Sequence, residues 1–147
     1  MTSAEALANP LHQDVSLSYP SFSAPELEGV HVDSHFSDRN REGRLLAFLA
    51  RFLSEKDRSE VVGLGLDERA AIVIQDGTFR VFSTAGQWVW LYRVTGPAHL
   101  AGGQPLDLSG ITRVRLASGA EWSWPPDFAS LQGIELRVQG GVVGVVQ

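Results

Sequence analysis

The chain has 147 residues, of which 44% are hydrophobic and 20% charged, so it can bury the core of one domain and is not disordered by composition. Its formal net charge is -5 and its cations are arginines with a single lysine, which argues against nucleic acid or an anionic membrane surface as the main partner. It has no cysteine, which excludes disulfides, thiolate metal sites and a cysteine nucleophile.

The N-terminal region has no targeting or membrane signal. It lacks the basic segment of a signal peptide, and no stretch approaches the roughly 20 apolar residues that span a bilayer. We therefore expect a cytoplasmic protein that does not contact membranes. Ser3 predicts the N-cap of a short helix over residues 4–8, and residues 15–19 alternate like a strand.

Residues 29–66 predict a strand, a helix and a second strand. The apolar run 29–33 has no alternating polar residues except His31, so we expect a strand that is buried on both faces. Residues 41–55 predict the helix, and the apolar run 61–66 predicts the next strand. The helix has one apolar stripe, formed by Leu45, Phe48, Leu49, Phe52 and Leu53. This order implies two parallel strands joined by a right-handed crossover.

The remainder of the chain is rich in predicted strands. Residues 71–74 and 79–82 flank Asp76-Gly77, which is typical of a β-hairpin turn. Further strands are predicted at 88–94, 113–116, 134–138 and 142–146. We expect a single domain over residues 1–147, in which an α/β segment (1–68) precedes a β-rich, largely antiparallel extension (69–147).

Ionisable residues gather at the carboxyl ends of the two predicted parallel strands, where open α/β sheets place their active sites. His35 could act as a general base, and Asp67 or Glu68 at the end of the next strand could orient its imidazole. Three arginines follow His35 and could bind a carboxylate or phosphate: Arg39, Arg41 and Arg44. An alternative is a divalent metal site formed by His31, Asp33 and His35 on one face of the strand.

The pattern Asp-x-His-Phe-x-x-Arg-x-Arg-x-Gly-Arg-Leu begins at Asp33, and Gly-x-Gly-x-Asp-Glu follows at Gly63. Together they resemble the cyanophycinase-like serine peptidases, which are relatives of peptidase E. The resemblance runs from about Ser3 to about Val81. It implies a partial flavodoxin-like parallel sheet, related to that of class I glutamine amidotransferases, and a triad of serine, histidine and glutamate.

On this resemblance, His35 matches the triad histidine and Glu68 the triad acid. The residues that match the surroundings of the substrate pocket are Asp33, Ser34, Arg39, Arg41 and Arg44. The implied substrates are acidic peptides or the aspartyl-arginine peptide of cyanophycin. Ser34 stands where cyanophycinases carry glutamine, which argues against cyanophycin itself.

The serine nucleophile of that family is missing. Family members carry it in a Gly-Thr-Ser-Ala-Gly-Ala elbow, and this sequence has no Gly-x-Ser-x-Gly. Thr2-Ser3-Ala4-Glu5-Ala6 is similar, but Met1 and Glu5 occupy the glycine positions. We therefore expect the C-terminal half of such a peptidase, inactive alone and without a cofactor or metal.

The expected partners are an N-terminal half that supplies the serine, a peptide substrate and further copies of this chain. Without the first strands of its parallel sheet, the chain should expose an apolar edge and self-associate. Two alternatives remain open. One is a catalytically dead binding or assembly module, and the other is the metal-dependent hydrolase using His31, Asp33 and His35.

Overall fold

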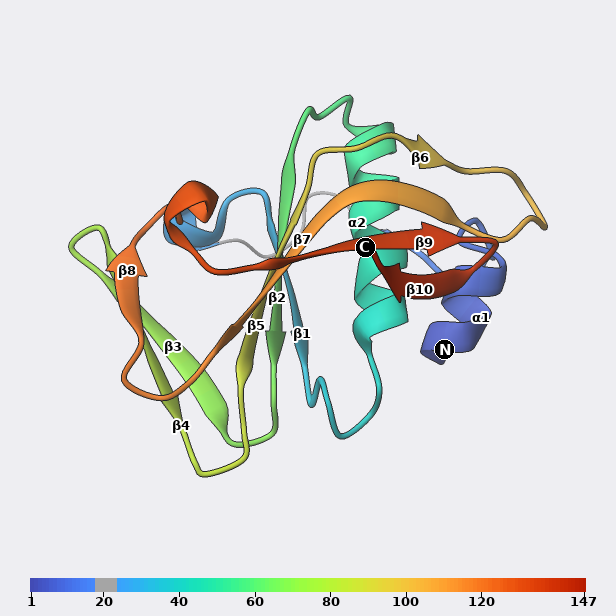
Figure 1. The fold of residues 1–147 in the computed structure, drawn as a ribbon. Helices are drawn as coiled ribbons and strands as arrows, with labels where there is room; N and C mark the ends of the chain where they lie inside the picture. Colours follow the sequence, from blue (N-terminus) through green and yellow to red (C-terminus); the bar gives the residue numbers. More distant parts are fainter. Residues whose placement is uncertain (18–23) are drawn as a thin grey trace.

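Within residues 1–17 and 24–147, the computed structural model has two α-helices and two β-sheets in a mixed α/β arrangement (Figure 1). The helices are α1 (Ser3–Ala8) and α2 (Glu42–Glu55), and the short 3-10 turns are η1 (Pro25–Leu27) and η2 (Phe128–Ser130). The strands are β1 (Val30–Ser34), β2 (Val61–Leu66), β3 (Ala70–Gln75), β4 (Thr78–Ser83), β5 (Val89–Val94), β6 (Ala98–His99), β7 (Asp107–Leu116), β8 (Glu121–Ser123), β9 (Ile134–Gln139) and β10 (Val142–Val145).

The larger sheet has the strand order β1-β2-β5-β7-β9-β10, with β6 paired to β7. The strands β1 and β2 are parallel and α2 connects them, which confirms the predicted strand–helix–strand unit. From β2 onwards every neighbour is antiparallel within the part of the chain that the structure describes. The β-rich extension therefore continues the sheet that β1 and β2 begin.

Helix α2 covers one face of the larger sheet because its apolar side is continuous. Leu45, Leu46 and Leu49 are fully buried, and each such side chain contributes about 2 kcal/mol through removal of apolar surface from water. Two glycines of β2 let the helix and the loop that precedes it approach closely. A Cβ on Gly63 would lie 2.8 Å from Leu49 Cδ1, and one on Gly65 would lie 2.5 Å from Phe36 Cγ.

The smaller sheet, β3-β4-β8, covers the opposite face of the larger one, as Figure 1 shows. The predicted Asp76-Gly77 hairpin between β3 and β4 is confirmed by the pairing of Gln75 with Thr78. Phe79 from β4 is buried between the sheets, and Trp122 and Trp124 pack against its ring at 5.9 and 5.7 Å. The larger sheet thus separates two apolar cores.

Strand β1 is less buried than its sequence predicts. Among the described residues it is an edge strand that pairs only with β2, and Val32 is 49% exposed. In β1, Asp33 is the buried residue. The expectation that this strand is buried on both faces is therefore wrong, because nothing in the described chain covers its outer side.

The N-terminal helix begins one residue earlier than predicted. Thr2, and not Ser3, is its N-cap, and the Thr2 hydroxyl accepts a hydrogen bond from the Glu5 backbone N–H. The Glu5 carboxylate in turn accepts the Thr2 backbone N–H, which completes a capping box. The strand-like segment 15–19 lies partly outside the described residues, and its described part, 15–17, is not a strand.

Candidate functional site

The candidate site begins where β1 and β2 end side by side. Ser34 pairs with Leu66 in the parallel register, so His35 and Asp67 follow at the same edge of the sheet. The two segments that follow β1 and β2 stay side by side beyond the strands, because the Phe36 backbone N–H donates a hydrogen bond to the Leu66 carbonyl at 3.0 Å. The structure therefore brings the predicted histidine and the predicted acids to one edge of the sheet.

His35 occupies a tight turn between β1 and α2. Its φ of 52° lies in the left-handed region, which is uncommon for residues other than glycine. The turn is closed by two backbone hydrogen bonds, from Arg39 N–H to the His35 carbonyl at 3.1 Å and from Arg41 N–H to the Phe36 carbonyl at 2.9 Å. The imidazole is half-buried and makes no hydrogen bond or ion pair with any residue that the structure describes.

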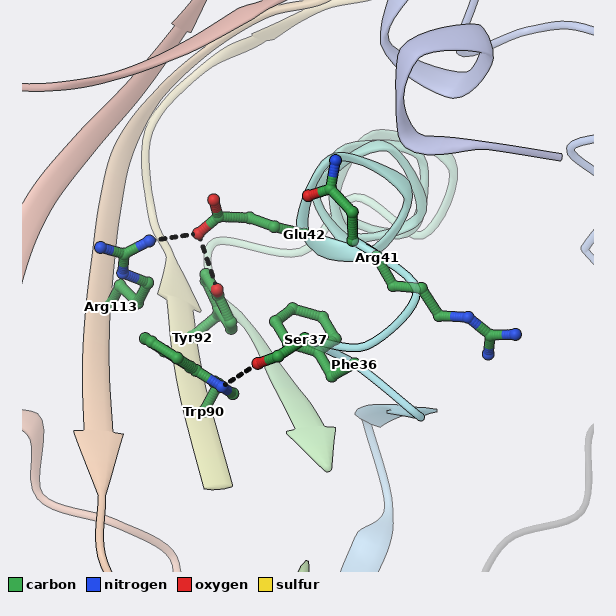
Figure 2. A pocket seen from close by; sticks show the side chains of 8 residues that line it. Phe36, Ser37, Arg41, Glu42, Trp90, Tyr92 and Arg113 are labelled. Carbon is green, nitrogen blue, oxygen red and sulfur yellow. Dashed lines mark hydrogen bonds and ion pairs between the residues drawn. The ribbon is translucent and has the colours of Figure 1, made fainter. Parts of the chain in front are cut away.

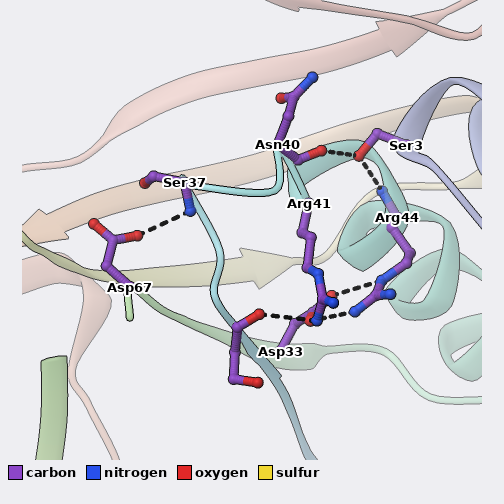
Figure 3. Close-up of polar contacts among 8 residues, drawn as sticks. Ser3, Asp33, Ser37, Asn40, Arg41, Arg44 and Asp67 are labelled. Atoms are coloured by element: carbon purple, nitrogen blue, oxygen red, sulfur yellow. Dashed lines mark hydrogen bonds and ion pairs between the residues drawn. The ribbon is translucent and has the colours of Figure 1, made fainter. Parts of the chain in front are cut away.

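Asp33 joins β1 to the start of α2 through two arginines (Figure 3). Arg41 donates to Asp33 Oδ1 at 2.9 Å and also to the Ser34 carbonyl at 2.9 Å. Arg44 binds both carboxylate oxygens of Asp33, with its Nε 2.9 Å from Oδ2. The Asp33 side chain is 8% exposed, so these ion pairs are well shielded from water. Two guanidinium groups against one carboxylate leave this cluster with a positive charge.

Asp67 fastens the His35 turn to the neighbouring strand. Its buried carboxylate accepts the backbone N–H of Ser37 at 3.0 Å and that of Trp88 at 2.8 Å. The sequence marked Asp67 as a possible partner of His35, but its oxygens are used by these two backbone groups. We infer that Asp67 positions the turn and does not contact the imidazole.

Glu68 and Arg39 are exposed at the same end of the sheet. The Glu68 backbone N–H donates to Asp38 Oδ2 at 3.4 Å, and its carboxylate makes no hydrogen bond to His35. The Arg39 side chain has no hydrogen bond or ion pair with residues 1–17 or 24–147. Of the three predicted arginines, Arg39 is therefore the one whose guanidinium no described residue binds.

A pocket of about 150 Å³ lies beside the turn, between the start of α2 and strands β5 and β7 (Figure 2). In it, the Tyr92 hydroxyl donates to Glu42 Oε1 at 2.8 Å and Arg113 Nη1 donates to the same oxygen at 2.7 Å. The Trp90 indole N–H donates to Ser37 Oγ at 3.1 Å, which connects the pocket wall to the His35 turn. The pocket residues from α2, β5 and β7 were not predicted as site residues from the sequence. They are Glu42, Trp90, Tyr92 and Arg113.

Burial and the Glu42 carboxylate shift the pKa values of Tyr92 and Arg113 in this pocket. Burial, followed by the negative charge of Glu42 and the hydrogen bond to it, raises the pKa of Tyr92 above its usual value. Burial lowers the pKa of Arg113, but the hydrogen bond to Glu42 and its charge outweigh burial and raise the pKa overall. Tyr92 is therefore a neutral hydrogen-bond donor at physiological pH, and Arg113 is a permanent cation.

Ser3 also lies at the start of α2, as Figure 3 shows. Its hydroxyl donates to the Asn40 carbonyl at 2.5 Å and accepts the Arg44 backbone N–H at 3.1 Å. That N–H belongs to the first turn of α2, so Ser3 satisfies one of the free donors at this helix end. The hydroxyl is thus engaged by the backbone and is not hydrogen-bonded to His35.

The metal alternative lacks a suitable cluster in the described chain. No group of three or more histidine, aspartate or glutamate side chains there could hold an ion. The His31 ring packs edge-on against Phe52 at 4.3 Å, and its burial lowers its pKa. The Asp33 carboxylate is already bound by Arg41 and Arg44.

Comparison with protein-family models, with curated proteins and with solved structures returned no match. Among the described residues, neither helix has the length and apolar character needed to cross a membrane.

Proposed function

We propose that this chain is the histidine- and acid-bearing segment of a cyanophycinase-like serine peptidase that cleaves aspartyl peptide bonds. The observation that carries this proposal is the parallel pairing of β1 with β2. This pairing places His35 and Glu68 just beyond the carboxyl ends of two neighbouring strands, at the same edge of the sheet. The sequence pattern from Asp33 to Leu45 supports it. In this proposal, this chain contributes the strands β1 and β2 and their connecting helix α2 to a flavodoxin-like fold.

The serine must come from a segment outside this sequence, since the Ser3 hydroxyl is bound to backbone groups. In the proposed reaction, the serine hydroxyl attacks the peptide carbonyl and transfers its proton to His35. His35 then protonates the leaving amine. In the second half of the reaction, a water molecule gives its proton to His35 and attacks the acyl-enzyme, and His35 returns the proton to the serine oxygen. The side chains of Glu68 and His35 are not hydrogen-bonded in the chain by itself. In this proposal, Glu68 accepts the second imidazole N–H of His35 only after the serine segment has bound.

The arginines have different parts in this proposal. Arg41 and Arg44 hold Asp33 and so fix the turn that carries His35. Arg39, whose guanidinium has no partner in the described chain, is available for the carboxylate of an aspartyl substrate. Arg39 is therefore the proposed substrate contact, and Arg41 and Arg44 are positioning residues.

Co-expression with a polypeptide that carries a Gly-Thr-Ser-Ala-Gly-Ala elbow tests this function. Such a polypeptide is sought in the DNA adjoining the coding sequence. We expect the pair to hydrolyse α- or β-aspartyl dipeptides and to react with a fluorophosphonate at the elbow serine. The change His35→Ala should lower hydrolysis by about 10³-fold or more, because it removes the general base.

The matched control is His99→Ala, which removes an exposed histidine on β6 and should leave the rate unchanged. Hydrolysis that survives His35→Ala, or a pair that reacts with neither probe, would contradict the proposed function.

A second candidate is a binding module without catalysis. It is favoured by the imidazole of His35, which has no hydrogen-bond or ion-pair partner among the described residues. For such a module, aspartyl peptides should bind with the same affinity to the chain and to its His35→Ala variant, and no serine segment should bring about hydrolysis.

A further inference from the structure

Two arginines and two tryptophans form a ladder on the face of the larger sheet that α2 covers in part. Trp90 pairs with Arg115 across β5 and β7, and Tyr92 pairs with Arg113 one step further along. The Arg115 guanidinium lies 4.3 Å from the centre of the Trp88 ring and 6.0 Å from that of Trp90. The Arg113 guanidinium lies 5.2 Å from the centre of the Trp90 ring. We name these four residues, Trp88, Trp90, Arg113 and Arg115, the arginine–tryptophan ladder.

The two arginines of the ladder differ in what they still can bind. Arg113 is ion-paired with Glu42, and its side chain is 24% exposed. Arg115 is exposed and makes no hydrogen bond or ion pair with any residue the structure describes. A guanidinium that stacks on an aromatic ring keeps its planar N–H edge free. Arg115 is thus held in place by Trp88, and no described residue accepts a hydrogen bond from its guanidinium.

The ladder is attached to the candidate site at two points. The Asp67 carboxylate binds the backbone N–H groups of Trp88 and Ser37, and Ser37 Oγ accepts the indole N–H of Trp90. The ladder therefore begins at the turn that follows His35. A ligand that lies along it would continue directly into the His35 turn.

We propose that the arginine–tryptophan ladder binds the side-chain carboxylates of an acidic peptide, with Arg115 as the principal contact. A carboxylate matches the planar fork of a stacked arginine and would receive two charge-assisted hydrogen bonds. That the peptide is an aspartyl substrate rests on the proposed function, whereas the carboxylate chemistry rests on the ladder alone.

Charge favours a peptide over a nucleic acid as the occupant. Arg113 already has its counter-ion in Glu42, which leaves Arg115 as the ladder arginine with no ion-pair partner among the described residues. A single free guanidinium can bind a carboxylate, but it cannot neutralise a run of phosphates.

Titration of the whole chain with a short poly-L-aspartate peptide tests the proposal. Tryptophan fluorescence and calorimetry should both report binding, and an uncharged peptide of equal length should not bind. The change Arg115→Gln should weaken binding about tenfold, as expected for loss of a charge-assisted bidentate contact. Arg115→Lys should also weaken it, because lysine keeps the charge but loses the planar fork.

The matched control is Arg137→Gln on β9. Arg137 is also exposed and unpartnered in the described chain, and it follows Leu136, which faces the α2 side, so it lies on the other face of the sheet. Its loss should change affinity by no more than about twofold at physiological salt, where distant charges are screened.

Three results would overturn the proposal: no binding of poly-L-aspartate, equal weakening by Arg115→Gln and Arg137→Gln, or tighter binding of a single-stranded oligonucleotide that depends on Arg115. These measurements need no serine segment. If binding depends on Arg115 but the co-expressed pair does not hydrolyse peptides, the proposed peptidase function is rejected and the proposed carboxylate site is supported.

Discussion

At the scale of single residues, the site depends on carboxylates that hold backbone and side-chain cations in place. Asp33 binds Arg41 and Arg44, and Asp67 binds the N–H groups of Ser37 and Trp88. The sequence placed Asp33 and the arginines in one region through their close spacing after the first predicted strand. It did not show that they bind one another, because an ion pair depends on how a turn folds back on the helix that follows it.

Tyr92 gives the pocket a measurable dependence of stability on pH. Its pKa is raised by burial and by Glu42, so the folded state holds the phenol proton at a pH where the unfolded chain releases it. The resulting stability is fully present below the unfolded pKa of about 10 and is lost as pH rises above it. We expect the free energy of unfolding to fall by up to about 1.4 kcal/mol per pH unit there.

Urea unfolding of the wild type and of Tyr92→Phe over this alkaline range measures the effect. The variant should be less stable near neutral pH by about 1–2 kcal/mol, because it loses a hydrogen bond to a charged acceptor. Its stability should fall less steeply than that of the wild type above pH 10 or so. Parallel curves for the two proteins would show that Tyr92 is not the responsible group.

At the scale of secondary structure, local patterns were sufficient for the elements with strong periodicity. The apolar repeat predicted α2, the apolar runs predicted β1 and β2, and Asp76-Gly77 predicted the β3–β4 hairpin. The short strands β6 and β8 have two and three residues, too few for alternation to be recognised. The first half of β7 was missed because Gly110, with a φ of 62°, and a shift in register interrupt its pattern.

The glycine at position 65 in β2 allows the close approach between the strand and the His35 turn. A side chain there would collide with Phe36, which is 3% exposed and so has little room to move. Gly65→Ala should therefore lower the free energy of unfolding by about 2 kcal/mol, a typical cost of overpacking.

Chemical denaturation measures this cost, and Gly144→Ala is the matched control. Gly144 is also a strand glycine, it has no positive φ, and a Cβ there would meet nothing within 4 Å. Its replacement should be neutral or slightly stabilising. If the two variants were equally stable, the contact between Phe36 and β2 would not constrain the turn.

At the scale of the whole molecule, the sheet order could not be read from the sequence. Antiparallel pairing of β5 with β2 joins the β-rich extension to the α/β segment, and it depends on contacts between strands that are distant in the chain. The arginine–tryptophan ladder arises from the register of β5 against β7, which no local pattern specifies. Sequence reasoning therefore found the residues of the turn but not the pocket beside it.

The two edges of the larger sheet determine how copies of this chain should associate. In the part of the chain that the structure describes, β1 pairs only with β2, and Val32 on it is 49% exposed. The other edge, β10, has two exposed valines, of which Val145 is 58% exposed. Unprotected apolar edges are templates for pairing with another chain. We expect self-association that increases with concentration and uses the β1 edge, which is the longer of the two.

Sedimentation equilibrium of two matched variants distinguishes the edges. Val32→Lys places a charge on β1 and should weaken association about tenfold, whereas Val145→Lys on β10 should have little effect. The reverse result would assign the contact to β10, and association unchanged by either variant would exclude both edges. Because the proposed serine segment would extend the sheet from β1, its addition should also dissociate the oligomer. An oligomer that persists in an active pair would show that the segment binds elsewhere.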